Sequence, residues 1–116
     1  MKRQVTITPE PINESALIAQ RVTSPGMGAV VCFLGVVRGT EGNANISALE
    51  YEVFQSMAEH QISLLLDEVA TRWPVESVRL VHRVGRVSVK EPSLWVEVVT
   101  PHRGEAFAAC QWLIDE

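Results

Sequence analysis

The sequence predicts a single α+β domain in which a largely antiparallel sheet is combined with three helices. Its 116 residues match the length of one domain, and 47% hydrophobic residues are enough to fill one core. Strand-like segments follow one another directly at two places, which favours antiparallel pairing over a doubly wound parallel sheet. The sequence contains no G-x-G-x-x-G or Walker pattern, so a nucleotide-binding α/β fold has no support.

The first half of the chain predicts a strand, a short helix and two further strands. Residues 4–8 alternate in polarity before two prolines, and Asn13 fits the N-cap of the helix that follows. Residues 28–39 form a nearly continuous valine-rich run between glycines, which is typical of a fully buried strand. The glycine- and asparagine-rich residues 39–45 predict a mobile loop, and alternation over residues 46–54 predicts a half-exposed strand.

The longest helix is expected over residues 56–73. Ser56 and Glu59 form a capping-box pattern at its start, and Pro74 ends it. Its apolar stripe consists of Ala58, Ile62, Leu65 and Val69. Three strands are expected next, over residues 77–85, 86–89 and 93–100.

The last helix is expected to begin near Pro101, with Thr100 as its cap. Its inner face should carry Phe107, Cys110 and Ile114. The predicted order is therefore strand, helix, strand, strand, helix, strand, strand, strand, helix, in one domain that spans residues 1–116.

Composition and charge exclude several classes of function. The net charge of −4 and the scattered arginines argue against general nucleic-acid binding, which needs a basic surface. The N-terminus has no signal-peptide core and no apolar run approaches about 18 residues, so a cytoplasmic location is expected. Cys32 and Cys110 are too few and too far apart for a metal motif, and we expect two buried, reduced thiols.

The stretch "VVTPHRGEAF" places two cationic side chains where a helix begins. His102 and Arg103 would lie beside unpaired backbone N–H groups and the positive end of the helix dipole. A cation at that end is mildly unfavourable by itself, so an anion bound between the side chains and the amides would explain it. Phosphate is the obvious candidate. The alternative is a solvated surface pair.

Arg38 supports the same interpretation, because it follows an apolar strand and precedes a glycine-rich loop. Such strand ends commonly carry binding residues. The alternative is a plain charge at the end of a strand. By local pattern, Phe33 in the same strand belongs to the core.

Two other groups of titratable residues have weaker claims. His82 and Arg83, with Arg86, could form a second positive edge, although a structural role fits them better. Glu50 and Glu52 face the same side of a strand, where acid and base roles could be divided. A solvated strand face is the simpler explanation for the two glutamates.

The segments "FLGVVRG", "LEYEVF", "RWP", "HRVGR" and "TPHRGEAF", in this order, resemble the large subunit of molybdopterin synthase. The resemblance implies an α/β hammerhead fold and a homodimer of large subunits. It also implies that a small ubiquitin-like subunit docks at each end, which gives a heterotetramer. The implied reaction is sulfur transfer from the thiocarboxylated diglycine C-terminus of the small subunit to cyclic pyranopterin monophosphate, giving the dithiolene of molybdopterin.

The resemblance also implies roles for individual residues. Arg38, His102 and Arg103 would be catalytic. The substrate-binding set would be Val36, Val37, Arg38, His102 and Arg103, with the last two contributed by the neighbouring protomer in one arrangement. Phe33 would shape the channel for the tail of the small subunit. No metal, no cofactor and no catalytic cysteine is implied.

The resemblance is incomplete at the C-terminal end. Family members continue into a basic segment with a Pro-x-Trp-Lys type motif, whose two lysines have catalytic and substrate-binding roles, whereas this sequence ends at Glu116. Either it is part of a longer protein, or it is a short paralogue that keeps the fold and acts as a scaffold for the small subunit. The 116 residues alone are expected to bind the partner but to turn over slowly. A generic phosphate-binding module is a third hypothesis.

Overall fold

The computed structural model describes residues 1–42, 44–51 and 54–116. Within these residues the elements follow in this order: β1 (Lys2–Thr8), α1 (Glu14–Ala19), β2 (Ala29–Val36), β3 (Thr40–Glu41), β4 (Ala44–Asn45), β5 (Ala48–Tyr51), α2 (Gln55–Arg72), β6 (Ser77–Arg83), β7 (Gly85–Ser88), β8 (Pro92–Thr100) and α3 (Arg103–Asp115). The predicted order is confirmed, with one added hairpin. The strand that contains Glu50 was also predicted to include Glu52 and Val53, which lie outside the described residues.

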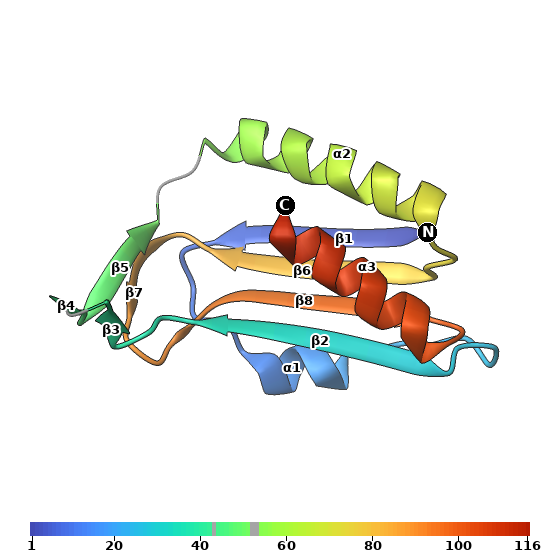
Figure 1. Cartoon of the computed structure of the whole chain (residues 1–116), viewed down its shortest axis with the longest axis horizontal. Coiled ribbons are helices and arrows are strands. Elements are labelled where there is room, and N and C mark those ends of the chain that lie inside the picture. Colours follow the sequence, from blue (N-terminus) through green and yellow to red (C-terminus); the bar gives the residue numbers. More distant parts are fainter. Residues whose placement is uncertain (43, 52–53) are drawn as a thin grey trace.

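The main sheet has the strand order β1-β6-β8-β2. Only β1 and β6 run parallel, while β6–β8 and β8–β2 are antiparallel. Strands β5 and β7 form a separate antiparallel ribbon at one end of the molecule (Figure 1). The α+β class with a mostly antiparallel sheet is therefore confirmed.

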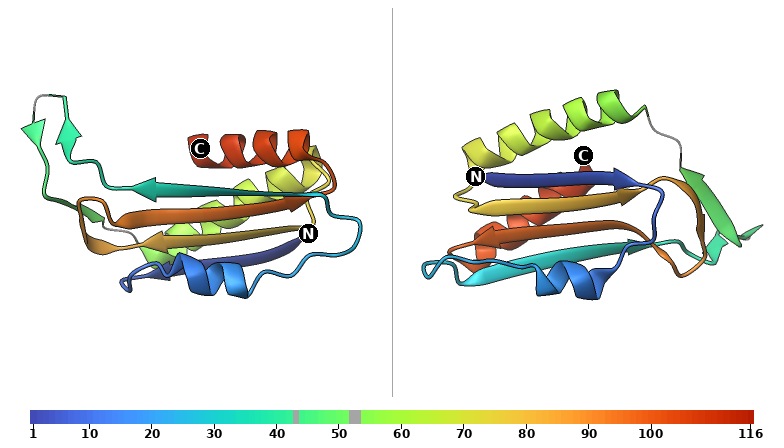
Figure 2. Two further views of the ribbon diagram at one scale, coloured as in Figure 1. Left: turned by 90° about the horizontal axis from the view of Figure 1, so that it is seen from below. Right: turned by 180° about the vertical axis from the view of Figure 1, so that it is seen from behind.

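The helices cover the two faces of the sheet unequally. Figure 2 shows α2 and α3 on one face and the short α1 on the other. Asn13 caps α1 as predicted, because its Oδ1 accepts a hydrogen bond from the amide of Ala16 at 3.1 Å. The face with two helices holds the core, and the α1 face stays partly open.

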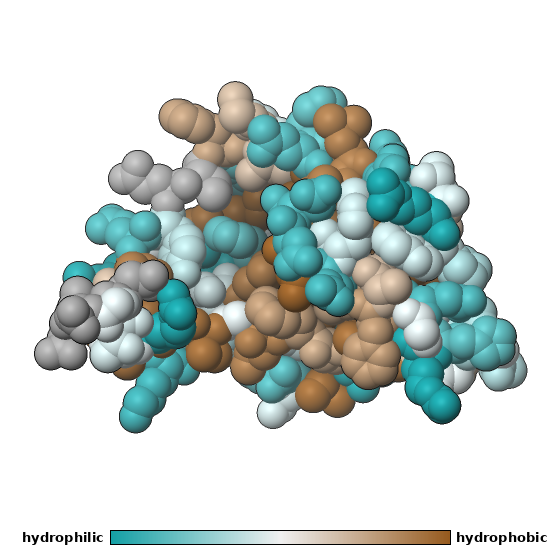
Figure 3. All heavy atoms as spheres, in the orientation of Figure 1, coloured by the Kyte–Doolittle hydropathy of each residue, from teal (hydrophilic) through white to brown (hydrophobic). Residues whose placement is uncertain are grey.

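Strand β2 is not the fully buried strand that its composition predicts. It lies at the edge of the sheet, and its residues alternate between half-buried and exposed. Val30, Leu34 and Val36 are 36%, 37% and 48% exposed, and Cys32 is exposed as well. The prediction was wrong because a continuous apolar run can also occur on a strand whose outer face has no packing partner within the same chain. Figure 3 shows apolar side chains gathered over the region of β2 and α3.

The segment predicted as a loop contains a short hairpin. Thr40–Glu41 pairs with Ala44–Asn45, and Gly42 adopts a φ of +59° in the turn. Positive φ is inexpensive for glycine, so the same residues that indicate a loop also permit a tight turn.

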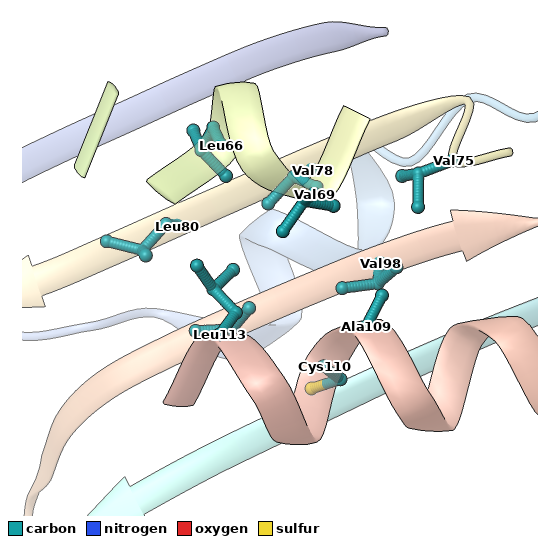
Figure 4. Packing of buried hydrophobic residues seen from close by; sticks show 10 residues of the cluster. Leu66, Val69, Val75, Val78, Leu80, Val98, Ala109, Cys110 and Leu113 are labelled. Carbon is teal, nitrogen blue, oxygen red and sulfur yellow. The ribbon is translucent and has the colours of Figure 1, made fainter. Parts of the chain in front are cut away.

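The core lies between the sheet and the helices α2 and α3 (Figure 4). Its fully or nearly fully buried side chains come from both helices and from β6 and β8: Leu66, Val69, Val78, Val96, Val98, Ala109, Cys110 and Leu113. Each fully buried Val or Leu side chain contributes about 1.5–3 kcal/mol relative to exposure. The apolar stripe predicted for α2 is confirmed at Val69. The prediction of two buried thiols is confirmed at Cys110 and wrong at Cys32, which is exposed on the edge strand β2.

Three details of the helices differ from the predictions. Helix α2 begins at Gln55 after an N-cap at Phe54, so Ser56 lies in the first turn and makes no cap. Helix α3 begins at Arg103, two residues later than expected. Phe107 is 62% exposed rather than on the inner face, because the buried face of α3 consists of Ala106, Ala109, Cys110 and Leu113.

Candidate functional site

Arg38 lies just beyond the end of β2, and two neighbouring segments hold the backbone of the residues on either side of it. The Val37 N–H donates to the carbonyl of Glu91 at 3.1 Å, and the Lys90 N–H donates to the carbonyl of Val37 at 2.9 Å. On the other side of Arg38, the Ile46 N–H donates to the carbonyl of Gly39 at 2.8 Å. The turn between β7 and β8 therefore fixes the exposed Arg38 residue on a rigid support.

His102 and Arg103 form the first residues of α3, as predicted. His102 is the N-cap and makes no side-chain capping bond. The Thr100 hydroxyl is not the cap either, because it donates to the carbonyl of His102 at 2.6 Å. The His102 side chain is 83% exposed, with its Nδ1 3.8 Å from Glu105 Oε1. Both residues are therefore exposed at the positive end of the helix dipole.

A close backbone contact fixes the start of α3 against the start of β2. The Gly28 N–H donates to the carbonyls of Thr100 at 3.2 Å and Pro101 at 3.1 Å. A Cβ at position 28 would lie 2.7 Å from the Pro101 carbonyl oxygen. Glycine is required here, because any side chain would collide with backbone atoms.

The predicted cationic set does not converge within one chain. In the register of β2 and β8, Ala29 pairs with Thr100 at one end and Val36 pairs with Pro92 at the other. Seven residue steps of about 3.4 Å separate these ends by about 24 Å. Figure 1 accordingly places the end of β2 beside β3 at one end of the sheet and the start of α3 at the opposite end. A joint site for Arg38 and Arg103 requires a second copy of the chain.

Phe33 and Val37 both face the protein interior. Phe33 is half-buried and packs against the core cluster, as its local pattern predicts. Its ring lies over Gly35, where an added Cβ would meet Phe33 Cε1 at 3.2 Å and Leu94 Cβ at 3.5 Å. Val37 is 2% exposed, and both of its backbone polar groups are hydrogen-bonded. It therefore supports Arg38, while Val36 presents an exposed side chain beside it.

An apolar groove of about 310 Å³, which the sequence reasoning did not identify, runs between α2, α3 and the sheet. It is lined by Ile7, Ala58, Gln61, Ile62, Leu65, Leu80, His82, Leu94, Val96, Leu113, Ile114 and Glu116. Leu94 connects the groove to Phe33 through Gly35. The strand alternation places these residues on the helix-covered face. Only the three-dimensional arrangement shows that the two helices diverge there and leave the sheet partly uncovered.

The second His-Arg pair makes contacts within the chain, which agrees with the structural role that was preferred for it. His82 stacks edge-on against Tyr51 at 5.8 Å, and burial lowers the pKa of its imidazole. Arg83 is 11% exposed and donates to Glu91 at 2.8 Å. That hydrogen bond lowers the pKa of the Glu91 carboxyl. Arg86 is exposed and lies opposite Glu50 in the β5–β7 ribbon, which agrees with a solvated strand face for Glu50.

A buried carboxylate on the α1 face was also missed. Glu97 is 2% exposed and accepts hydrogen bonds from Arg21 at 2.6 Å and from Arg79 at 2.8 Å on each oxygen. Burial acts to raise the pKa of Glu97, but the two guanidinium groups outweigh it and hold the pKa below its ordinary value. Cys32 Sγ accepts from Arg21 at 3.2 Å, and although the residue is exposed, partial desolvation outweighs Arg21 and raises the pKa of the thiol. The signal was available: a single glutamate inside the apolar run "SLWVEVVT" needs buried partners.

Two searches of the described part of the chain gave negative findings. No helix there is both long and apolar enough to cross a membrane. No group of three or more His, Cys, Asp or Glu residues there is arranged to hold a metal ion.

Comparisons with known proteins agree with one another. The model of a family described as MoaE protein matches residues 7–116. A protein of Thermoplasma volcanium named molybdopterin synthase catalytic subunit is 40% identical over 111 residues, which cover 96% of this chain and 80% of that protein. A protein of the same name from Ralstonia nicotianae is 34% identical over 99 residues, which cover 85% of this chain and 56% of the relative.

A solved structure shares the whole fold. The molybdopterin biosynthesis MoaE protein from Burkholderia ambifaria superimposes with a TM-score of 0.85 at 34% sequence identity. The match covers 99% of this chain and 75% of that one. The similarity therefore includes both the Arg38 end of the sheet and the start of α3.

Proposed function

This chain belongs to the MoaE protein family, and from that premise we propose that it acts as the large subunit of a molybdopterin synthase. The proposal rests on one combination: the chain belongs to this family, and it exposes Arg38 at one position and the His102–Arg103 pair at another. The substrate would be cyclic pyranopterin monophosphate, whose phosphate needs cationic partners. The sulfur would arrive on the thiocarboxylated tail of a small ubiquitin-like subunit, so this chain supplies positioning and charge rather than a nucleophilic thiol.

The free edge of β2 supports a site that is shared between two copies. A two-fold axis through this edge would pair β2 with β2 of a second copy in antiparallel register, as isologous contacts require. The Val36 end of one strand would then meet the Ala29 end of the other. Because Gly28 holds the start of α3 at that end, Arg38 of one copy would approach Arg103 of the other. This arrangement removes the separation of about 24 Å that exists within one chain.

The surface around β2 fits a second copy of the chain. Val30, Leu34 and Val36 expose apolar side chains on the strand, and Phe107 does so on α3. An unpaired, uncharged edge strand is normally protected by pairing. We therefore propose that the large subunits form a homodimer through β2, in which each site takes Arg38 from one copy and His102 and Arg103 from the other.

The groove between α2 and α3 is the proposed channel for the small-subunit tail. A diglycine terminus has no side chains, so an extended tail fits a narrow apolar groove. The groove is lined by Leu94, which pairs with Gly35 near the end of β2, three residues before Arg38. The thiocarboxylate would thus be delivered to the Arg38 end of the sheet.

A reconstituted sulfur-transfer assay tests the proposal. The chain is mixed with thiocarboxylated small subunit and cyclic pyranopterin monophosphate, and dithiolene product is measured after conversion to a fluorescent derivative. Arg38→Ala should lower the rate about a hundredfold, because charge-assisted contacts to a phosphate contribute about 1.5–3 kcal/mol. Arg72→Ala, which removes an exposed arginine of α2, is the matched control and should not change the rate.

Other outcomes would assign a different function. Binding of the small subunit with no turnover, and no effect of Arg38→Ala, would indicate a scaffold. Binding of phosphate compounds without any affinity for the small subunit would indicate a generic phosphate-binding module. Either result contradicts the proposed enzyme.

A further inference from the structure

The turn that supports Arg38 contains a lysine in a conformation that normally selects glycine. The Glu91 N–H donates to the carbonyl of Ser88 at 3.0 Å, which closes a four-residue turn from Ser88 to Glu91. Lys90 occupies the third position with a φ of +70°. Among the described residues it is the only non-glycine residue with positive φ. A type II turn requires such a φ at this position, and glycine is the usual residue there.

This turn is attached directly to the residue before Arg38. The backbone groups of Val37 exchange hydrogen bonds with Lys90 and Glu91, at 2.9 and 3.1 Å. Paired backbones of this kind place Cα atoms about 5 Å apart, and Arg38 is one residue further on. The Cα atom of the exposed Lys90 therefore lies within about 9 Å of the Arg38 Cα atom, and Lys90 carries a flexible four-carbon stem.

The charge of Lys90 is available to a ligand. Among the described residues, no carboxylate forms an ion pair with it. The adjacent carboxylate of Glu91 is instead bonded to Arg83 at 2.8 Å. A strained, non-glycine backbone that persists in a folded protein is a reason to look for function at that residue.

We propose that Lys90 is a second substrate-binding cation, which acts with Arg38 on the anionic group of the substrate. This inference rests on the proposed function and adds a residue to its site. The guanidinium of Arg38 supplies a planar fork for phosphate oxygens, and the ammonium of Lys90 supplies a compact point charge from the neighbouring turn. Lys90 binds and orients the substrate and does not itself take part in bond making.

The experiment compares four variants of the chain in complex with the small subunit. Lys90→Gln and Lys90→Gly remove the charge, Lys90→Arg keeps it, and Lys2→Gln removes the other lysine, which lies on β1. We expect Lys90→Gln to weaken the binding of cyclic pyranopterin monophosphate about tenfold and to raise KM more than it lowers kcat. Lys90→Arg should restore most of the binding, and Lys2→Gln should match the unsubstituted chain.

Lys90→Gly separates function from folding. Glycine adopts positive φ without steric cost, so this variant should raise Tm by about 4 °C while binding the substrate as weakly as Lys90→Gln does. Equal substrate binding in Lys90→Gln, Lys2→Gln and the unsubstituted chain would overturn the role of Lys90. If the unsubstituted chain binds no substrate and Arg38→Ala changes nothing, the proposed function fails instead.

Discussion

Mixing two inactive variants tests whether the catalytic site is shared between copies. If Arg38 comes from one protomer and Arg103 from the other, Arg38→Ala and Arg103→Ala each damage both sites of their own homodimer. Equal amounts refolded together give about half mixed dimers, and each mixed dimer has one intact site and one doubly damaged site. Activity should therefore rise from about a hundredth to about a quarter of that of the unsubstituted protein.

The assay is the sulfur-transfer reaction, measured per large subunit before and after joint refolding. The control combines both substitutions in one chain and refolds it with unsubstituted chain. A shared site leaves about a quarter of the activity, because both sites of every mixed dimer are damaged, whereas a site within one chain leaves about half. Joint refolding of the two single variants without any gain in activity would refute the shared site.

Four further predictions concern the packing and the surfaces. Glu97→Gln should cost about 3–5 kcal/mol in urea unfolding, because two partly buried guanidinium groups lose their counter-charge, while Glu68→Gln in the exposed pair with Arg72 should cost below about 0.5 kcal/mol. The folded-state pKa of Glu97 is lowered, so its contribution to stability is present above the ordinary glutamate pKa and is lost as the pH falls through the folded value. Unfolding midpoints between neutral and acidic pH should therefore decline more steeply in the unsubstituted chain than in Glu97→Gln, and equal slopes would contradict this. Leu34→Glu should dissociate the dimer in sedimentation experiments, whereas Leu64→Glu on the outer side of α2 should not; dissociation by both would remove the argument for β2. Ala58→Trp should fill the groove and abolish binding of a small-subunit tail peptide in fluorescence anisotropy, with Ala70→Trp on the exposed side of α2 as the control, and unchanged binding would place the tail elsewhere.

The sequence pattern predicted the elements well, because most of them have strong local signals. The cap at Asn13 and the buried Val69 of α2 follow directly from capping chemistry and helical periodicity. The edge position of β2 could not be predicted in this way. An apolar run indicates that both faces of a strand are covered by other apolar groups. It does not indicate whether those groups belong to the same chain or to another one.

The candidate site shows the same limit. The chemistry of a helix start and of a strand end selected Arg38, His102 and Arg103, the motif resemblance agreed, and the structure places each at an exposed end of an element. Their separation within one chain depends on the register of β2 against β8, which no local pattern specifies. Lys90 received no role from the sequence because it matches neither of the two lysine positions of the family, and only its φ and the hydrogen bonds to Val37 distinguish it.

The contact between Gly28 and Pro101 fixes the start of β2 to the first turn of α3. If two copies meet along β2, any sliding of one strand past the other would carry the imidazole and guanidinium of α3 with it. The register of the two β2 strands would then set the distance between Arg38 of one copy and Arg103 of the other. A bulkier residue at position 28 would displace His102 and Arg103 without contacting their side chains. The affected site would be the one that takes its Arg38 from the neighbouring copy.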